Sequence, residues 1–269
     1  MNWLAQSLNS ALGELGGIVL FLREIVRTFL KTHGNLEPIA AQVISVTLRS
    51  LPTVAFAGVF VGAILVLQFN QILASYDAQS FLGGLNTSSV IRQVGPLLIS
   101  FLLAGKIGAF AAAELGTMRV TEQIDAIQCL GTNPIQYLIV PRFFGILISS
   151  LILVLLGLII SVFGSMGVAS LLCGINPLQY IQSIPRFTDI GTMVGGMFQT
   201  AVYGTIVGAV ACHKGYTASG GARGVGRAVT LAAIYTNFYI TLANFVTSEI
   251  ISWISNVFSW FYGNGGVGR

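Results

Sequence analysis

Five stretches of the sequence are each long enough and apolar enough to cross a lipid bilayer as a helix. Such a helix needs about 20 mostly apolar residues, because lipid offers no partner for exposed backbone groups. Only the second stretch contains charge well inside it, at Lys106 and Glu114. The stretches run from about Leu51 to Ser75, Val94 to Met118, Phe143 to Cys173, Ile190 to Ala211 and Ala228 to Ile251. We therefore predict an all-α integral membrane protein with five transmembrane helices.

The composition excludes a soluble domain. Charged residues make up 8% of the 269 positions and hydrophobic residues 54%, whereas soluble domains carry about 25% charged residues. A chain with so little charge cannot cover a surface that faces water, so most of its surface must face lipid. The net charge of +4 does not indicate nucleic acid, because the basic residues are scattered and form no stripe.

The residues before the first stretch predict an amphipathic helix. Apolar residues recur there at helical spacing, and Arg23, Arg27 and Lys31 follow one another at every fourth position. Glu14 and Glu24, together with these arginines, interrupt the apolar core that a signal peptide requires. We predict an interfacial helix in the headgroup layer, with a soluble helix packed on a partner as the alternative. The apolar positions are Leu15, Ile18, Val19, Leu22, Ile25, Val26 and Phe29.

The distribution of Lys and Arg predicts the orientation. Nine of the thirteen lie on the side of the N-terminus, whereas Arg92, Arg186 and Arg269 lie opposite and Lys106 lies in the membrane. Because basic residues favour the cytoplasmic side, we predict an N-in, C-out topology. The nine are Arg23, Arg27, Lys31, Arg49, Arg119, Arg142, Lys214, Arg223 and Arg227.

The sequence contains no internal repeat and no shift in composition that marks a second domain. We divide it into an amphipathic interfacial region, residues 1–48, and a single five-span domain, residues 49–257. The glycine-rich end, residues 258–269, is predicted to be a disordered tail.

A short helix is predicted in the cytoplasmic loop between the second and third stretches. Thr121 is a candidate N-cap, and Glu122 and Asp125 place negative charge where the helix dipole favours it. Gly131 can end the helix, and Asn133-Pro134 predicts a turn. The residues alone fit equally a helix that docks on a motor subunit and one that caps the bundle. The apolar edge consists of Ile124, Ile127 and Leu130.

This loop resembles the signature of the MlaE/YrbE permeases of MCE-associated ABC lipid transporters. The matching run is Ala-Ala-Glu-Leu-Gly-Thr-Met-Arg-Val-Thr-Glu-Gln-Ile-Asp-Ala over residues 112–126, followed by Asn133-Pro134 and by residues 137–142, Tyr-Leu-Ile-Val-Pro-Arg. Further similarity occurs in Gly-Gly-Ala-Arg-Gly-Val-Gly, residues 220–226, and in the first stretch from Val59 to Gln68. The resemblance covers most of residues 50–250.

The resemblance implies both a partner set and an activity. The chain would form a homodimer in a Gram-negative-type inner membrane and bind two copies of a cytoplasmic ABC ATPase, which hold ATP-Mg. It would pass phospholipid to or from a periplasmic MCE-domain protein, a hexamer, for outer-membrane lipid homeostasis. A small regulatory subunit on the ATPase is a further expectation.

Two groups of residues follow from the resemblance. Because Gln93 replaces the acid that relatives carry beside the arginine, we expect Arg92 to be free to bind a lipid phosphate. Asn244 likewise replaces an Asp that is frequent in the family, which leaves its role open. The predicted ATPase contacts are Glu122, Gln123, Asp125 and Ile127, with Arg119 orienting the helix. The predicted lipid-binding residues are Leu65, Leu67, Gln68, Ile72, Leu73, Tyr76, Arg92 and Gln93.

The chain itself offers no catalytic, metal or nucleotide motif. His33 and His213 lie in separate segments, and the cysteines lie far apart. The glycine-rich residues 215–226 follow no strand and lack the spacing of a phosphate-binding loop. We therefore predict no cofactor in this chain. The alternative is an ion-coupled secondary transporter of an amphipathic substrate. It would rely on Lys106 and Glu114, which could pair only if their helix bends.

Overall fold

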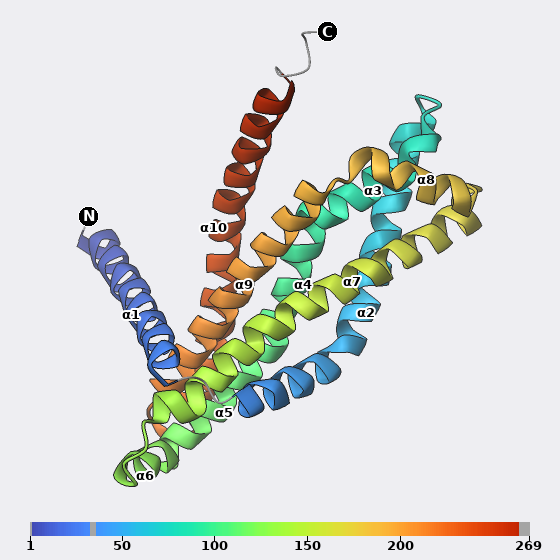
Figure 1. The fold of residues 1–269 in the computed structure, drawn as a ribbon. Coiled ribbons are helices and arrows are strands. Elements are labelled where there is room, and N and C mark those ends of the chain that lie inside the picture. The colour runs from blue at the N-terminus through green and yellow to red at the C-terminus, as the bar shows by residue number, and fades with distance from the viewer. Residues whose placement is uncertain (1, 33–35, 264–269) are drawn as a thin grey trace. The chain divides into compact units, whose positions relative to one another are not determined.

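The computed structural model describes residues 2–32 and 36–263, with side chains described for residues 13–31 and 36–254. Over this part of the chain every regular element is a helix, which confirms the predicted all-α class (Figure 1). The longer elements are α1 (Asn2–Thr32), α2 (Leu36–Ala74), α7 (Val140–Cys173), α9 (Ile190–Tyr216) and α10 (Gly221–Gly263). The shorter elements are η1 (Gln79–Phe81), α3 (Leu82–Ser89), η2 (Val90–Val94), α4 (Gly95–Leu103), η3 (Ala104–Gly108), α5 (Ala109–Val120), α6 (Gln123–Cys129), η4 (Ile135–Ile139) and α8 (Pro177–Phe187).

Five helical segments among the described residues are long and apolar enough to span a membrane, which confirms the predicted number. Helix α2 begins at Leu36, ahead of the boundary predicted at residue 48, and α10 continues to Gly263. The predicted disordered tail therefore begins within α10, and its last residues, 264–269, lie outside the described residues. The N-in, C-out orientation stays a prediction. The spans are Leu36–Ala74, Gln79–Val120, Ile135–Cys173, Ile190–Tyr216 and Gly221–Ile254.

The chain divides into two compact units, to each of which every spanning segment contributes. Unit 1 consists of Met1–Leu48, Leu103–Ser149 and Gly204–Phe238. Unit 2 consists of Arg49–Leu102, Ser150–Tyr203 and Tyr239–Arg269. Of the nine basic residues predicted to lie inside, only Arg49 falls in unit 2, which also contains Arg92 and Arg186. The two predicted groups of basic residues thus separate almost completely between the units.

In unit 2, α2 and α7 pack through glycine and serine residues. A Cβ atom added at Gly58 would lie 2.8 Å from the carbonyl oxygen of Gly157, and one at Gly62 would lie 2.5 Å from that of Ser161. These distances leave no room for any side chain. Because lipid removes the hydrophobic force between spans, such close backbone contacts are what hold transmembrane helices together.

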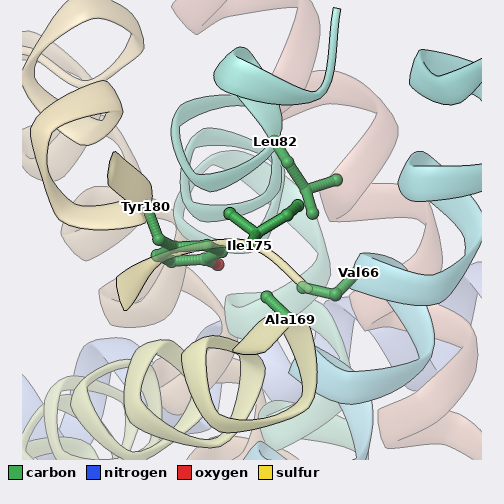
Figure 2. Packing of buried hydrophobic residues seen from close by; sticks show 5 residues of the cluster. All are labelled: Val66, Leu82, Ala169, Ile175 and Tyr180. Atoms are coloured by element: carbon green, nitrogen blue, oxygen red, sulfur yellow. The ribbon is translucent and has the colours of Figure 1, made fainter. Parts of the chain in front are cut away.

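The buried cluster of unit 2 joins α2, α3, α7 and α8 (Figure 2). Inside it, the Tyr180 hydroxyl accepts a hydrogen bond from Asn86 Nδ2 at 2.9 Å and lies 2.8 Å from Ser165 Oγ. The ring fills apolar space while its hydroxyl provides a partner for two buried polar side chains. The cluster consists of Val66, Leu82, Ala169, Ile175 and Tyr180.

Candidate functional site

The predicted coupling residues lie at the corner between α5 and α6 in unit 1. The Thr121 hydroxyl donates to the carbonyl oxygen of Thr117 at 2.8 Å, so it completes α5. Glu122 occupies the position before α6 in a left-handed conformation, with φ 60°, and makes no capping hydrogen bond through its side chain. The prediction of Thr121 as the N-cap of α6 is therefore wrong, because its hydroxyl bonds backward.

Helix α6 is held against α5 by an ion pair between Arg119 and Asp125. The orienting role of Arg119 stays a prediction, for which this pair supplies a contact. The Arg119 guanidinium carbon also lies 5.9 Å from the centroid of the Tyr216 ring, so one side chain links α5, α6 and α9. Gly131 ends α6 with φ +76°, as predicted. The predicted turn follows, with Asn133 Oδ1 accepting a hydrogen bond from the amide of Ile135.

One edge of α6 and the turn after it are accessible. Glu122 and Gln123 are exposed and Asp125 is half-buried. Leu130 is 83% exposed, whereas Ile124 is fully buried. The predicted apolar edge is therefore divided, with Ile124 packed inward, Ile127 half-buried and Leu130 available to a partner.

Glu114 of α5 pairs with an arginine of α7. Arg142 Nη2 at the start of α7 lies 2.7 Å from Glu114 Oε1, an acid that sequence reasoning had considered only with Lys106. Lys106 is exposed on η3. Both η3 and η2, which carries Arg92, are π-helical turns, a feature that is frequent at functional sites.

Unit 2 contains all eight predicted lipid-binding residues. Leu67 and Ile72 on α2 are exposed, as is Tyr76 in the turn after α2, at 77%. Leu73 instead packs against the buried cluster, where it contributes to the packing of unit 2. The remaining members are half-buried or exposed, namely Leu65, Gln68, Arg92 and Gln93.

Arg92 has an acidic neighbour that the sequence did not reveal. Its Nη2 donates to Thr192 Oγ1 at 3.3 Å, and the Thr192 hydroxyl and amide both donate to Asp189 Oδ1. These bonds from Thr192, together with the charge of Arg92, hold the pKa of Asp189 below its ordinary value of 3.8. Asp189 thus places an acid near Arg92 through Thr192, and the binding of a lipid phosphate by Arg92 stays a prediction.

Asn244 accepts a hydrogen bond at Oδ1 from the Tyr203 hydroxyl at 2.9 Å, and that hydroxyl lies 3.3 Å from Thr247 Oγ1. Sequence reasoning missed Tyr203, which is fully buried. The neutral amide at position 244 therefore serves as the acceptor for a buried phenol.

Comparison with known proteins decides the family. The family model described as Permease MlaE matches residues 39–250. The chain belongs to the MlaE permease family. The permease is 34% identical over 237 residues to a probable ABC transporter permease protein of Rickettsia felis, covering 88% of this chain and 92% of the relative. It is 36% identical over 195 residues to one from Synechocystis, covering 72% and 73%.

A third relative comes from a chloroplast. The permease is 32% identical over 201 residues to the Arabidopsis thaliana protein TRIGALACTOSYLDIACYLGLYCEROL 1, covering 75% of this chain and 57% of the relative. The matches confirm the resemblance found in the sequence and support an ABC transporter permease. They favour this class over an ion-coupled secondary transporter.

Proposed function

We propose that the permease moves phospholipid between the inner membrane and a periplasmic MCE-domain hexamer, for outer-membrane lipid homeostasis. It works as a homodimer in an inner membrane of Gram-negative type. Two copies of a separate ABC ATPase supply the energy and hold ATP-Mg, and a small regulatory subunit can bind them. The membership in a family of ABC permeases supports the ATPase partner.

The observation that carries this proposal is the position of α6 and its contacts with α5. It is a short helix between two spans, fixed by Arg119–Asp125, with Glu122, Gln123 and Leu130 accessible beside it. Because Ile124 is also buried, α6 moves together with α5, so a force applied by a docked ATPase reaches the second span. The absence of a nucleotide-binding motif from the sequence supports a separate source of energy.

Lipid as the substrate has two supports. The Arabidopsis relative is named for a galactolipid. In this chain, the exposed apolar residues Leu67, Ile72 and Tyr76 lie in the same unit as Arg92, whose guanidinium suits a phosphate. Acyl chains would contact the apolar residues, and the phosphate would bind Arg92.

The assembly is tested by the charge reversal Asp125→Lys. We expect it to break the pair with Arg119 and to weaken the association of the co-expressed ATPase by about tenfold, as truncation of a central contact does. The control Asp77→Lys makes the same reversal in unit 2 and should leave association unchanged. Co-purification in mild detergent, followed by titration, measures both. Wild-type association of Asp125→Lys would contradict docking on α6.

The lipid site is tested by Arg92→Glu. We expect less phosphorus to co-purify with the permease, because a carboxylate repels a lipid phosphate. Arg186→Glu is the matched control, since Arg186 is also an exposed arginine of unit 2 and lies over the Phe81 ring. Equal phosphorus content in wild type and Arg92→Glu would remove Arg92 from the site. ATP-dependent lipid transfer in proteoliposomes tests the whole proposal.

A further inference from the structure

Helix α1 packs within unit 1 through one face. Ile18, Phe21 and Ile25 are buried, with Ile25 at 0% exposure, whereas Val19 and Leu30 are 60% and 73% exposed. The buried face approaches the end of α9 closely. The helix is therefore attached to the protein along one side and leaves another apolar side free for lipid.

A polar contact fixes the start of this buried face. Glu14 Oε1 lies 2.8 Å from Lys214 Nζ, and that ammonium lies 4.4 Å from the centroid of the Tyr235 ring on α10. Burial alone raises the pKa of Glu14, but hydrogen bonds from Lys214 and Tyr235 and the charge of Lys214 outweigh it and hold the pKa below 4.5. Glu14 is thus a carboxylate at neutral pH.

Aromatic contacts continue from α1 toward α6. The Phe21 ring lies 5.4 Å from the His213 ring and 5.8 Å from the Tyr216 ring, measured between centroids. The Tyr216 ring lies under Arg119, which pairs with Asp125 of α6. All of these residues belong to unit 1. An unbroken series of contacts therefore connects α1 with the helix that we assign to ATPase docking.

We propose that Glu14 and Lys214 are a positioning pair that holds α1 on α9 and thereby sets the orientation of α6 through Tyr216 and Arg119. This rests on the proposed function, since it assigns α1 a part in transmitting ATPase movement. The pair is poorly explained by stability alone. A charge as buried as Lys214, at 8% exposure, costs desolvation energy that apolar residues would not, so geometric specification is the better reason for the pair.

The first test uses the permease without the ATPase. Hydrogen exchange of residues 113–130 in detergent reports the order of α6 directly. We expect Glu14→Gln to raise exchange there, and the double swap Glu14→Lys with Lys214→Glu to restore protection. The matched control is Glu24→Gln, an identical change at an exposed position of α1, which should leave exchange unchanged. Wild-type exchange in Glu14→Gln would overturn the proposal.

The second test uses the complex in proteoliposomes and measures lipid moved per ATP hydrolysed. We expect Glu14→Gln to lower this ratio about fivefold, the small end of measured couplings between sites, while the ATPase binds within twofold of its wild-type affinity. A loss of ATPase binding equal to the loss of transfer would show a structural role only and overturn the proposal. The proposal would also be overturned if the double swap restored thermal stability but did not restore the amount of lipid moved per ATP hydrolysed.

The two tests separate this inference from the proposed function. If the wild-type permease binds no ATPase, the proposed function fails, while hydrogen exchange in the permease alone still decides whether α1 positions α6. If Glu14→Gln cannot be purified, the double swap carries the decision. The proposal is supported if the double swap shows wild-type hydrogen exchange in residues 113–130 and moves as much lipid per ATP as wild type. It is overturned if either quantity departs from wild type.

Discussion

The contacts inside unit 1 differ in kind from the contacts inside unit 2. In unit 1, ion pairs join separate helices: Glu14 with Lys214, and Glu114 with Arg142. In unit 2, backbones approach through Gly58 and Gly62, and the buried polar groups around Tyr180 are neutral. The difference shows which property of the side chains, volume or charge, matters for the packing of each unit. Unit 2 depends on side-chain volume. Unit 1 also has close glycine contacts, since a Cβ at Gly215 would lie 2.7 Å from Leu115 Cβ, but it depends on charge as well.

This difference has a mechanical consequence. A glycine contact that leaves no space for a Cβ has one geometry, because any separation of the helices exposes a gap without partner atoms. An ion pair instead specifies which two side chains must meet, because a partly buried charge needs its partner. Unit 1 therefore adds contacts specified by charge to its packing, and it also contains α6 and α1.

The largest expected effect comes from added volume in unit 2. Gly62→Ala puts a Cβ 2.5 Å from the carbonyl oxygen of Ser161, and we expect a loss of about 2–3 kcal/mol of stability from overpacking. Gly167→Ala is the matched control in α7, because a Cβ there meets nothing within 4 Å. Thermal unfolding in detergent measures both. Equal melting temperatures for the two variants would refute the dependence of unit 2 on volume.

A smaller effect is expected from removing charge in unit 1. The Arg142 side chain is 11% exposed and that of Glu114 is 43% exposed, so the pair is intermediate between surface and core. We expect Arg142→Met to cost about 1–2 kcal/mol, because it leaves Glu114 partly buried without this partner. Adding Glu114→Gln should recover part of that loss. The same unfolding assay, run as a double-mutant cycle, measures the coupling.

A double variant no more stable than Arg142→Met alone would contradict the pairing. It would also weaken the comparison, since unit 1 would then not depend on charge at this contact. High salt provides a further check. It should reduce the difference between wild type and Arg142→Met only slightly, because partly buried pairs are screened less than exposed ones.

The spans were predictable because lipid imposes a simple rule on the sequence. Each spanning helix must satisfy its backbone internally and present apolar side chains, so composition alone located all five. The position of α6 also follows from local sequence, whereas the role of Arg119 is implied by the family resemblance and stays a prediction. Helix α8 was missed because it is too short and too polar to span, although Asn176-Pro177 carries a start signal. Asn176 caps that helix by accepting a hydrogen bond from the amide of Leu178.

The polar partners could not be predicted, since nothing periodic connects residues that are far apart in the chain. Arg92 and Thr192 are 100 positions apart, and Glu14 and Lys214 meet only because α1 packs on α9. The prediction of Thr121 as the N-cap of α6 was wrong for a local reason. A threonine hydroxyl at a helix boundary can bond forward as a cap or backward to the previous turn, and the left-handed Glu122 decides between them.

The smallest expected effect tests the exception to the comparison, because Asp189 and Arg92 place charges in unit 2. A carboxylate whose folded pKa is lowered stabilises the protein above its unfolded pKa, near 3.8, and this contribution is lost as the pH falls through the folded pKa. Asn caps a helix about as well as Asp. Asp189→Asn should therefore lower the melting temperature less than Arg142→Met, by an amount constant from about pH 5 to pH 8. The difference from wild type should shrink on further acidification. A difference that varies between pH 5 and pH 8 would mean that a second titratable group interacts with Asp189, and unit 2 would then depend on charge as unit 1 does.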